Sequence, residues 1–349
     1  IIFCNGDNDT FPLWYNIEVE EERNDVRACN LSYLQTDWYI SQMKRPYYNS
    51  PALPISWEYK DYMPGKNEVV WVENRLNAPL EVKKAFQFLH STDPRTKRDG
   101  EGYIPSDQLY VLSPDGQQIP LKKAKRFTRS EMMVMEMLST NEWKRPFYFA
   151  VTIGDDYHLG LNPYLELTGL AYRITPERSA DGRPRVNTEV MYDNMLHKFK
   201  YGNMNVPGIY IDENTMRMCR THRMMFFELV EALYNEGKRD KCLEVLDFAE
   251  EVLPGYNIPY DYTSASMAQY YYQLGEIEKG NAIMTKVADT CAEYLKWGAS
   301  LDKDNRAAAQ STLGHQSAIL GYVLQTLERY QQKDLFNQYY DIYAQYASR

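Results

Sequence analysis

A short acidic loop directly after the first apolar run of the chain is the first candidate for chemistry. It consists of Gly6, Asp7, Asn8, Asp9 and Thr10. We expect a buried strand at residues 1–4 before this loop and a helix at 11–21 after it. In an open parallel sheet, ligands bind beyond the carboxyl ends of strands and beside helix N-termini. The loop is therefore a candidate site for contact with a ligand or an acceptor.

The same loop admits two other interpretations. Asp7 and Asp9, two residues apart, resemble the metal-binding carboxylate pair of some sugar-nucleotide transferases, although two carboxylates form only part of a magnesium or calcium shell. Asp9 or Thr10 could instead cap the helix, with Pro12 in its first turn. We expect no cofactor in this chain, and a divalent metal on Asp7 and Asp9 is the alternative. A single glycine makes neither a dinucleotide fingerprint nor a P-loop.

Two further polar loops follow predicted strands. Asp155, Asp156 and His158 come after the apolar run at 147–153, and the segment that ends at Asp37 follows the run at 26–31. If the strands are parallel and central, these loops and the Asp7 loop open on one edge and frame a polar crevice that binds an acceptor or ligand. His158 is a candidate base there. The alternative is three ordinary solvated loops, and the familiar hydrolase and metalloprotease motifs are absent.

Alternating strand-like and helix-like segments must position these loops. Short runs rich in Val, Ile, Tyr and Phe predict strands at 1–4, 26–31, 69–72, 109–112, 147–153 and 170–174. Helical patterns lie between several of them, at 11–21, 37–43, 80–91 and 129–142. Residues 44–67, rich in proline, predict an irregular excursion. The alternation favours a three-layer, Rossmann-like α/β domain with a mostly parallel sheet at residues 1–175.

The rest of the chain changes period and becomes helical. Residues 176–211 are dense in Pro and Gly, and we place an irregular joint there. Residues 212–349 predict an all-α domain of tetratricopeptide-like helical hairpins. The best match to the second half of such a repeat is Gly237, Cys242, Leu246, Ala249 and Pro254. The alternative is a plain helical bundle.

The same spacing recurs twice, less regularly, so that three hairpins fit. The second set is Gly275, Gly280, Met284 and Val287, and the third is Gln331, Phe336, Tyr340 and Tyr343. A glycine turns the chain between two antiparallel helices, and the following positions form one packing face. A regular superhelix of such hairpins would offer a groove for a peptide partner.

Charge and hydropathy exclude some classes of protein. A formal net charge of -9 argues against a protein that wraps nucleic acid, because such binding needs a basic face. No stretch approaches the roughly 20 continuous apolar residues that cross a bilayer. The chain starts without Met, in what we interpret as a buried strand, and we therefore expect it to be part of a longer protein.

Three phrases carry a resemblance to a known family. They are GDNDTFPLWY, DVRACNLSYLQTDWYISQMKRPYY and NEWKRPFYFAVT. The chain resembles the extramembrane portion of a Bacteroidetes family of large multi-spanning membrane proteins of unknown function. That family is grouped with the transmembrane protein O-mannosyltransferases. The resemblance is expected to cover nearly the whole chain.

The resemblance implies transfer of a sugar from a lipid-phosphate donor to a protein or glycan acceptor outside the cytoplasm. In such enzymes the catalytic acid lies near the first membrane helices, so the resemblance implies that this chain is inactive by itself. It also implies a periplasmic location and a partner in the protein's own upstream transmembrane region. Asp7, Asn8 and Asp9 would follow the last membrane span, where related transferases place acceptor-contacting motifs.

Three hypotheses of function follow. The first is the periplasmic domain of a membrane glycosyltransferase, which positions an acceptor or gives structural support. The second is a tetratricopeptide-type scaffold that binds a partner protein. The third is a soluble nucleotide-using enzyme, which depends only on the alternation of strands and helices.

Overall fold

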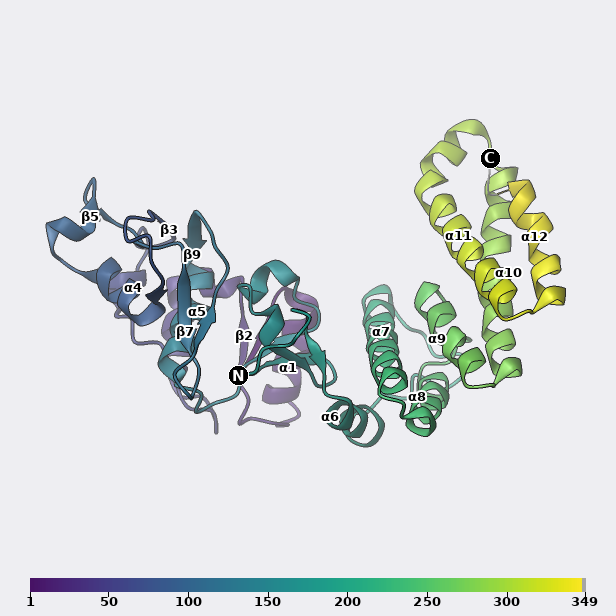
Figure 1. Ribbon diagram of the computed structural model, residues 1–349, viewed down its shortest axis with the longest axis horizontal. Helices are drawn as coiled ribbons and strands as arrows, with labels where there is room; N and C mark the ends of the chain where they lie inside the picture. Colours follow the sequence, from purple (N-terminus) through teal and green to yellow (C-terminus); the bar gives the residue numbers. More distant parts are fainter. Residues whose placement is uncertain (347–349) are drawn as a thin grey trace. The chain divides into compact units, whose positions relative to one another are not determined.

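The computed structural model describes residues 1–346, which form two compact units. The first unit is Ile1–Asn187 and the second begins at Thr188. The boundary between them lies inside residues 176–211. In Figure 1 the first unit runs from purple to teal along the chain, and the second runs from teal through green to yellow.

A six-stranded sheet organises the first unit. Its strands, in spatial order, are β13 (Arg185–Val186), β11 (Leu165–Leu167), β12 (Ala171–Ile174), β10 (Tyr148–Ala150), β1 (Ile2–Cys4) and β2 (Ala28–Asn30). Strand β1 is parallel to both of its neighbours, β2 and β10. Strand β12 is antiparallel to β10 and β11, and β13 is parallel to β11. The predicted fold class is confirmed: the sheet is mixed and mostly parallel, within an α/β unit.

Helices alternate with the strands as the sequence pattern predicts. The helices of the first unit are α1 (Asp7–Glu18), α2 (Asp37–Met43), α3 (Tyr59–Tyr62), α4 (Val82–His90) and α5 (Arg129–Asn141). Short 3-10 turns lie at Tyr33–Gln35, Pro94–Thr96, Asp155–His158 and Asn162–Tyr164. Helix α2 has the predicted bounds, and α4 and α5 differ from the predicted bounds by at most two residues at each end. Residues 44–67 contain only α3, in agreement with the expected excursion.

Helix α1 begins four residues earlier than predicted. Gly6 is its N-cap residue with φ 89°, a left-handed backbone conformation that suits glycine. This glycine lets the chain turn from β1 into the helix within two residues. The expectation that Asp9 or Thr10 caps α1 is therefore wrong, because both lie inside the first turn and no side chain caps this helix.

Two of the predicted strands lie outside the six-stranded sheet. Strand β3 (Val69–Trp71) pairs with β9 (Arg126–Thr128), and β7 (Leu109–Leu112) pairs with β4 (Leu80–Glu81) and β8 (Gln118–Pro120). Strands β5 (Lys97–Arg98) and β6 (Glu101–Gly102) form a third small pair. The sequence Ser113-Pro-Asp-Gly116 is typical of a tight turn, and it reverses the chain so that β7 and β8 are antiparallel.

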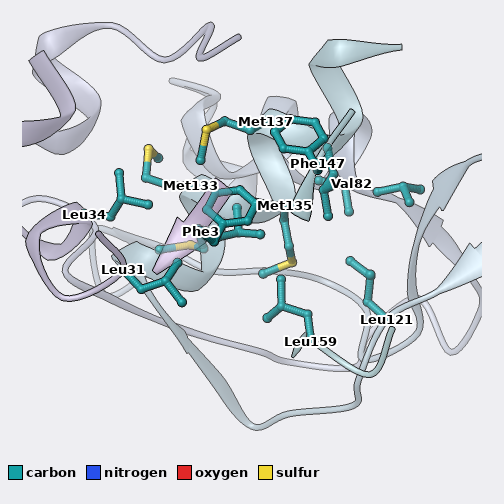
Figure 2. Packing of buried hydrophobic residues seen from close by; sticks show 14 of the residues in the cluster. Phe3, Leu31, Leu34, Val82, Leu121, Met133, Met135, Met137, Phe147 and Leu159 are labelled. Atoms are coloured by element: carbon teal, nitrogen blue, oxygen red, sulfur yellow. The ribbon is translucent and has the colours of Figure 1, made fainter. Parts of the chain in front are cut away.

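One continuous apolar core holds the first unit together. Figure 2 shows methionines of α5 in the same cluster as Phe3 of β1 and Leu34 of the loop after β2. Met133, Met135 and Met137 are all buried, since α5 has apolar neighbours around most of its circumference. Methionine is flexible enough to fill an irregular space between short strands and loops. This packing holds the loops that follow β1 and β2 in place.

The second unit consists of packed helices. They are α6 (Thr188–Asp193), the π-helical turn Asn194–Lys198, α7 (Glu213–Asn235), α8 (Arg239–Val252), α9 (Tyr262–Gln273), α10 (Ile277–Ser300), α11 (Lys303–Arg329) and α12 (Lys333–Tyr346). The last six form the three predicted hairpins: α7 with α8, α9 with α10 and α11 with α12. Gly237, Gly275 and Gln331, at the three turns, all have positive φ. The all-helical class of this unit is confirmed.

The predicted packing face holds in the first two hairpins and shifts in the third. Cys242, Leu246 and Ala249 are buried, as are the equivalent positions of α10. In α12 the buried tyrosine is Tyr339, and Tyr340, the predicted packing residue, is exposed. The reason is a specific contact with α10, because the Tyr339 hydroxyl donates to Asp289 at 2.6 Å.

Within residues 1–346, no helix combines the length and the apolar character that a membrane span requires.

Candidate functional site

Three loops meet at one edge of the six-stranded sheet. Strands β1, β2 and β10 are adjacent and parallel, so their carboxyl ends lie on the same side. The Asp7 loop follows β1, the segment that leads to α2 follows β2, and the segment that leads to Asp155 follows β10. The predicted placement of these loops at a common sheet edge agrees with the topology. We call this region the carboxyl edge.

Asp9 ties two of the three loops together. Its carboxylate accepts a hydrogen bond from the Thr152 hydroxyl at 2.7 Å, across a long sequence separation. The same carboxylate oxygen accepts from the backbone N–H of Asn5 at 3.2 Å. One carboxylate oxygen has enough lone pairs to accept both of these bonds. One carboxylate oxygen of Asp9 is therefore already used in hydrogen bonds to other residues of the chain.

Asp7 and Asn8 occupy the start of α1 and are exposed. Backbone N–H groups in the first turn of a helix lack intrahelical acceptors, and the helix dipole favours negative charge there. These two side chains are the part of the predicted site that a ligand could reach.

Thr10 lies beneath the loop, fully buried. Its hydroxyl donates to the Cys4 sulfur at 3.0 Å and accepts from the Asn30 side-chain amide at 2.9 Å. Asn30, the last residue of β2, also accepts from the backbone N–H of Tyr33 at 3.0 Å. A buried polar chain of this kind is stable only when its members are paired. Thr10 is thus a support for the edge and does not face solvent.

Burial of this network acts on Cys4. Desolvation raises the pKa of the Cys4 thiol to about 12, against a smaller opposing effect of the hydrogen bond from Thr10. A thiol with so high a pKa is not a nucleophile at neutral pH. Cys4 is a packing residue of the carboxyl edge.

Asn5, Asn30, Ser32 and Thr152 are polar residues of this edge that the sequence reasoning missed. The Ser32 hydroxyl donates to the Asn5 side-chain carbonyl at 2.7 Å, which joins the loops after β1 and β2. Asn5 and Asn30 could have been identified from the sequence, because each is a polar residue at or just past the end of a buried apolar strand. Polar atoms there must be paired because the strands around them are buried.

Asp37 is the first residue of α2, and its hydrogen-bond partner lies outside the loop at 7–10. Its carboxylate accepts from the Tyr59 hydroxyl at 3.0 Å. The neighbouring Gln35 bonds to the start of α5, where its side-chain oxygen accepts from the backbone of Ser130 at 3.0 Å. In the described residues, no hydrogen bond or ion pair joins Asp37 to the loop at 7–10. Gln35 thus connects the edge to α5, and Asp37 connects it to α3.

The acidic pair after β10 is exposed, and the histidine beside it is buried. Asp155 and Asp156 lie in the 3-10 turn Asp155–His158. Only 1% of His158 is exposed, and its Nδ1 is 2.9 Å from the Asn162 side-chain oxygen. Its ring packs against Phe149, with centroids 4.9 Å apart. The structure therefore separates His158 from solvent, whereas the two aspartates face it.

The environment of His158 favours its neutral form. Desolvation lowers the pKa of the imidazole, and the hydrogen bond with Asn162 and the charge of Asp155 oppose this effect only partly. Its Nε2 has no hydrogen-bond partner among residues 1–346. A neutral, enclosed imidazole packs as an aromatic ring.

Metal ligation by the predicted pair has little support in the geometry. Across residues 1–346, no three side chains of His, Cys, Asp or Glu gather as they would around a metal ion. Asp9 already accepts two hydrogen bonds from protein groups. A cation at Asp7 and Asp9 would need water for most of its ligands.

Comparison with known proteins identifies a matching family model. A family model described as TMEM260-associated domain 2 matches residues 1–120 and 114–194. These segments cover more than half of the chain, namely the α/β unit and the short helix α6. The match is narrower than the nearly complete resemblance expected from the sequence. No curated protein and no solved structure matches significantly.

Proposed function

The chain belongs to the TMEM260-associated domain 2 family, and we propose that it positions an acceptor for a membrane-embedded glycosyltransferase of the protein O-mannosyltransferase kind. In this proposal its partner is a transmembrane region of the same protein, upstream of Ile1. The unit lies on the periplasmic face of the membrane, and it is not catalytic by itself. Support comes from the family match and from the resemblance of the segment GDNDTFPLWY.

The carboxyl edge is the observation that carries the proposal. Asp9 and Thr152 join the loops after β1 and β10, and Ser32 joins the loop after β2 to Asn5. The edge is therefore held by hydrogen bonds on both sides of β1. Strand β1 lies between β10 and β2 at this edge. Asp7 and Asn8 follow β1, as the first two residues of α1, and their side chains are exposed. A rigid support with free polar groups at its rim is what recognition of a polar acceptor requires.

The chemistry assigned to this edge is positioning. In transfer from a lipid phosphate, the bond between the sugar C1 and the phosphate oxygen breaks, and the lipid phosphate leaves. The acceptor hydroxyl oxygen bonds to C1 and gives its proton to a base, which in this proposal belongs to the membrane region. Holding the acceptor in a reactive orientation lowers the entropic part of the barrier. Asp7 and Asn8 would accept and donate hydrogen bonds to acceptor hydroxyl or amide groups.

Two experiments test this function. The first reads the native gene upstream of Ile1, where we expect about eight or more apolar segments, each of roughly 20 residues. A reading frame that begins close to Ile1 would remove the membrane partner. The second places a photo-crosslinking amino acid at Asn8 of the whole protein in its membrane. Acceptor should become attached at Asn8 and not at Asp99, an exposed loop position of the same unit.

A second candidate is a scaffold that binds a peptide in the helical unit. The observation that favours it is a groove with a volume of about 600 Å³ between the end of α10 and the first half of α11. Leu295, Leu301 and Leu313 line it, and Gly298 allows close approach of Leu313. Such a groove could take an apolar side chain of a partner segment.

The two candidates make different predictions for a substitution in this groove. Leu313→Glu in the whole chain places a charge among apolar side chains. If the helical unit is the functional scaffold, this variant loses its partner in a pull-down, whereas Asp7→Ala retains it. Loss of sugar transfer in Asp7→Ala with an unchanged partner in Leu313→Glu would favour the acceptor function.

A further inference from the structure

A groove rich in aromatic rings lies between α1 and α2, over the edge strand β2. It has a volume of about 550 Å³. The aromatic side chains that line it are Phe11, Trp14, Tyr33, Trp38, Tyr39 and Tyr47. We call it the aromatic groove. Buried residues close its inner side, among them Ile17, Ala28 and Met43.

Four of the rings form a connected row. The ring centroids of Phe11 and Trp14 are 5.6 Å apart, those of Trp14 and Tyr33 are 6.1 Å apart, and those of Tyr33 and Trp38 are 5.9 Å apart. Both ends of the row are open to solvent, since Phe11 is 47% exposed and Trp38 is 55% exposed. Several large rings exposed together mark a surface that binds something.

Charged groups lie at one end of the same groove. Glu18 accepts hydrogen bonds from the hydroxyls of Tyr47 at 2.6 Å and Tyr48 at 3.1 Å. Arg27 is 4% exposed, and its Nη2 donates to the backbone carbonyls of Gln42 and Arg45. Its other terminal nitrogen, Nη1, is buried and has no hydrogen-bond partner within the described part of the chain. The groove thus combines ring faces with the carboxylate of Glu18 as an acceptor and with the buried guanidinium of Arg27, whose central carbon lies 5.3 Å from the centroid of the Tyr47 ring.

We propose that the aromatic groove binds a sugar ring of a neutral glycan. A pyranose presents a face of C–H groups, which packs on an aromatic ring, and hydroxyls at its rim that both donate and accept. Glu18 can accept from such hydroxyls, and Arg27 places a positive charge beside it. Because the guanidinium of Arg27 is buried and the carboxylate of Glu18 is the more accessible of the two charges, an anionic ligand would meet repulsion from Glu18, which favours a neutral ligand.

Other ligands that stack on aromatic rings fit less well. A proline-rich peptide also packs on such rings, but proline has no N–H group to donate to Glu18. A nucleic acid brings phosphates, and the chain carries a net charge of -9. The inference does not depend on the acceptor function, because the groove would bind a sugar whether or not Asp7 and Asn8 contact an acceptor.

Calorimetric titration of the 349-residue chain tests the inference. The probes are maltotriose, cellotriose, mannotriose and chitotriose, each titrated separately. We expect at least one of them to bind, and Trp38→Ala to weaken that binding by about tenfold or more, since stacking on one ring contributes roughly that factor. Glu18→Gln should weaken the same binding by removing the charged acceptor.

A matched control separates the groove from the rest of the surface. Trp71 of β3 is 58% exposed and does not line the groove, so Trp71→Ala should leave saccharide binding unchanged. The far-ultraviolet circular dichroism and the melting temperature of each variant show whether it is folded. The inference is overturned if none of the four saccharides binds at about 10 mM. It is also overturned if Trp38→Ala binds as wild type does, or if a proline-rich peptide or a nucleotide binds there in place of saccharides.

Discussion

The carboxylate of Asp9 accepts a hydrogen bond from the hydroxyl of Thr152 at 2.7 Å, although 143 residues separate them in the chain. This bond joins the loop after β1 to the loop after β10. It therefore fixes the place where Asp7 and Asn8 emerge into solvent. The acceptor proposal depends on this rigidity.

Thr152→Val should loosen the carboxyl edge without unfolding it. Valine has the same shape as threonine but no hydroxyl, so Asp9 loses one of its two protein donors. Because the pair is near the surface, we expect a loss of about 1 kcal/mol in the free energy of unfolding. Urea unfolding followed by tryptophan fluorescence measures this. Thr221→Val, whose hydroxyl bonds only to its own helix, is the control, and equal losses in the two variants would contradict the role of Thr152.

Arg223→Met should destabilise the helical unit strongly. The guanidinium is buried, and it donates to the backbone carbonyls of Leu253, Ile258 and Pro259 at 2.8 to 3.0 Å. Methionine leaves these carbonyls unpaired, and the expected loss in unfolding free energy is about 3 kcal/mol. Arg220→Met, on the exposed side of the same helix, should change it by less than about 0.5 kcal/mol. A small effect at Arg223 would show that water replaces the lost donors.

Stability should fall on mild acidification because one buried and two half-buried histidines have lowered pKa values in the folded chain. Desolvation lowers the pKa of His90, His158 and His222 in the folded chain. The unfolded chain then binds protons more readily than the folded chain, so stability rises with pH up to about 6.5, the ordinary histidine value. Below that pH the stability is progressively lost until the lowered folded pKa values are reached.

The melting temperature at pH 7.5 and 5.5 measures this effect. We expect a lower value at pH 5.5, and His158→Phe should reduce the difference between the two. Phenylalanine can occupy the space beside Phe149 and cannot take up a proton. A melting temperature that stays the same between these pH values would contradict the lowered pKa values of these three imidazoles.

The five cysteines should be unreactive in the folded chain. Cys4, Cys29, Cys219, Cys242 and Cys291 are all free and buried. Burial raises the pKa of every one of these thiols, to about 12 for Cys4 and Cys291 and to about 11 for Cys242. A disulfide reagent at pH 8 should therefore modify none of them before urea is added and all of them afterwards. Rapid reaction of one thiol in the native chain would show that its surroundings open.

Periodic apolar patterns predicted most of the fold, because burial decides where short strands and amphipathic helices form. The bounds of α2 were predicted to the residue, and the packing positions at Cys242, Leu246 and Ala249 are buried as expected. The start of α1 was predicted too late. The conformation of Gly6 decides it: a glycine permits a positive φ, but its presence alone does not show that the helix begins at the next residue.

Strand partners and side-chain partners were harder to predict because they depend on contacts distant in sequence. The pattern of β7 does not reveal that this strand pairs with β8 outside the main sheet, although the Pro-Asp-Gly turn is a clue. Tyr339 packs in place of Tyr340 because the Tyr339 hydroxyl donates a hydrogen bond to Asp289 of α10. At the carboxyl edge, the common position of the loops could be predicted from the expected parallel strands. The hydrogen bond between Asp9 and Thr152 could not be predicted in this way.

The most direct test of the acceptor proposal measures sugar transfer by membranes that contain the whole protein. Asp7→Ala combined with Asn8→Ala should raise the KM for the acceptor by about tenfold, with the KM for the lipid-linked donor unchanged. Asp99→Ala, at an exposed position of the same unit, should alter neither value. An unchanged acceptor KM in the double variant would contradict the account.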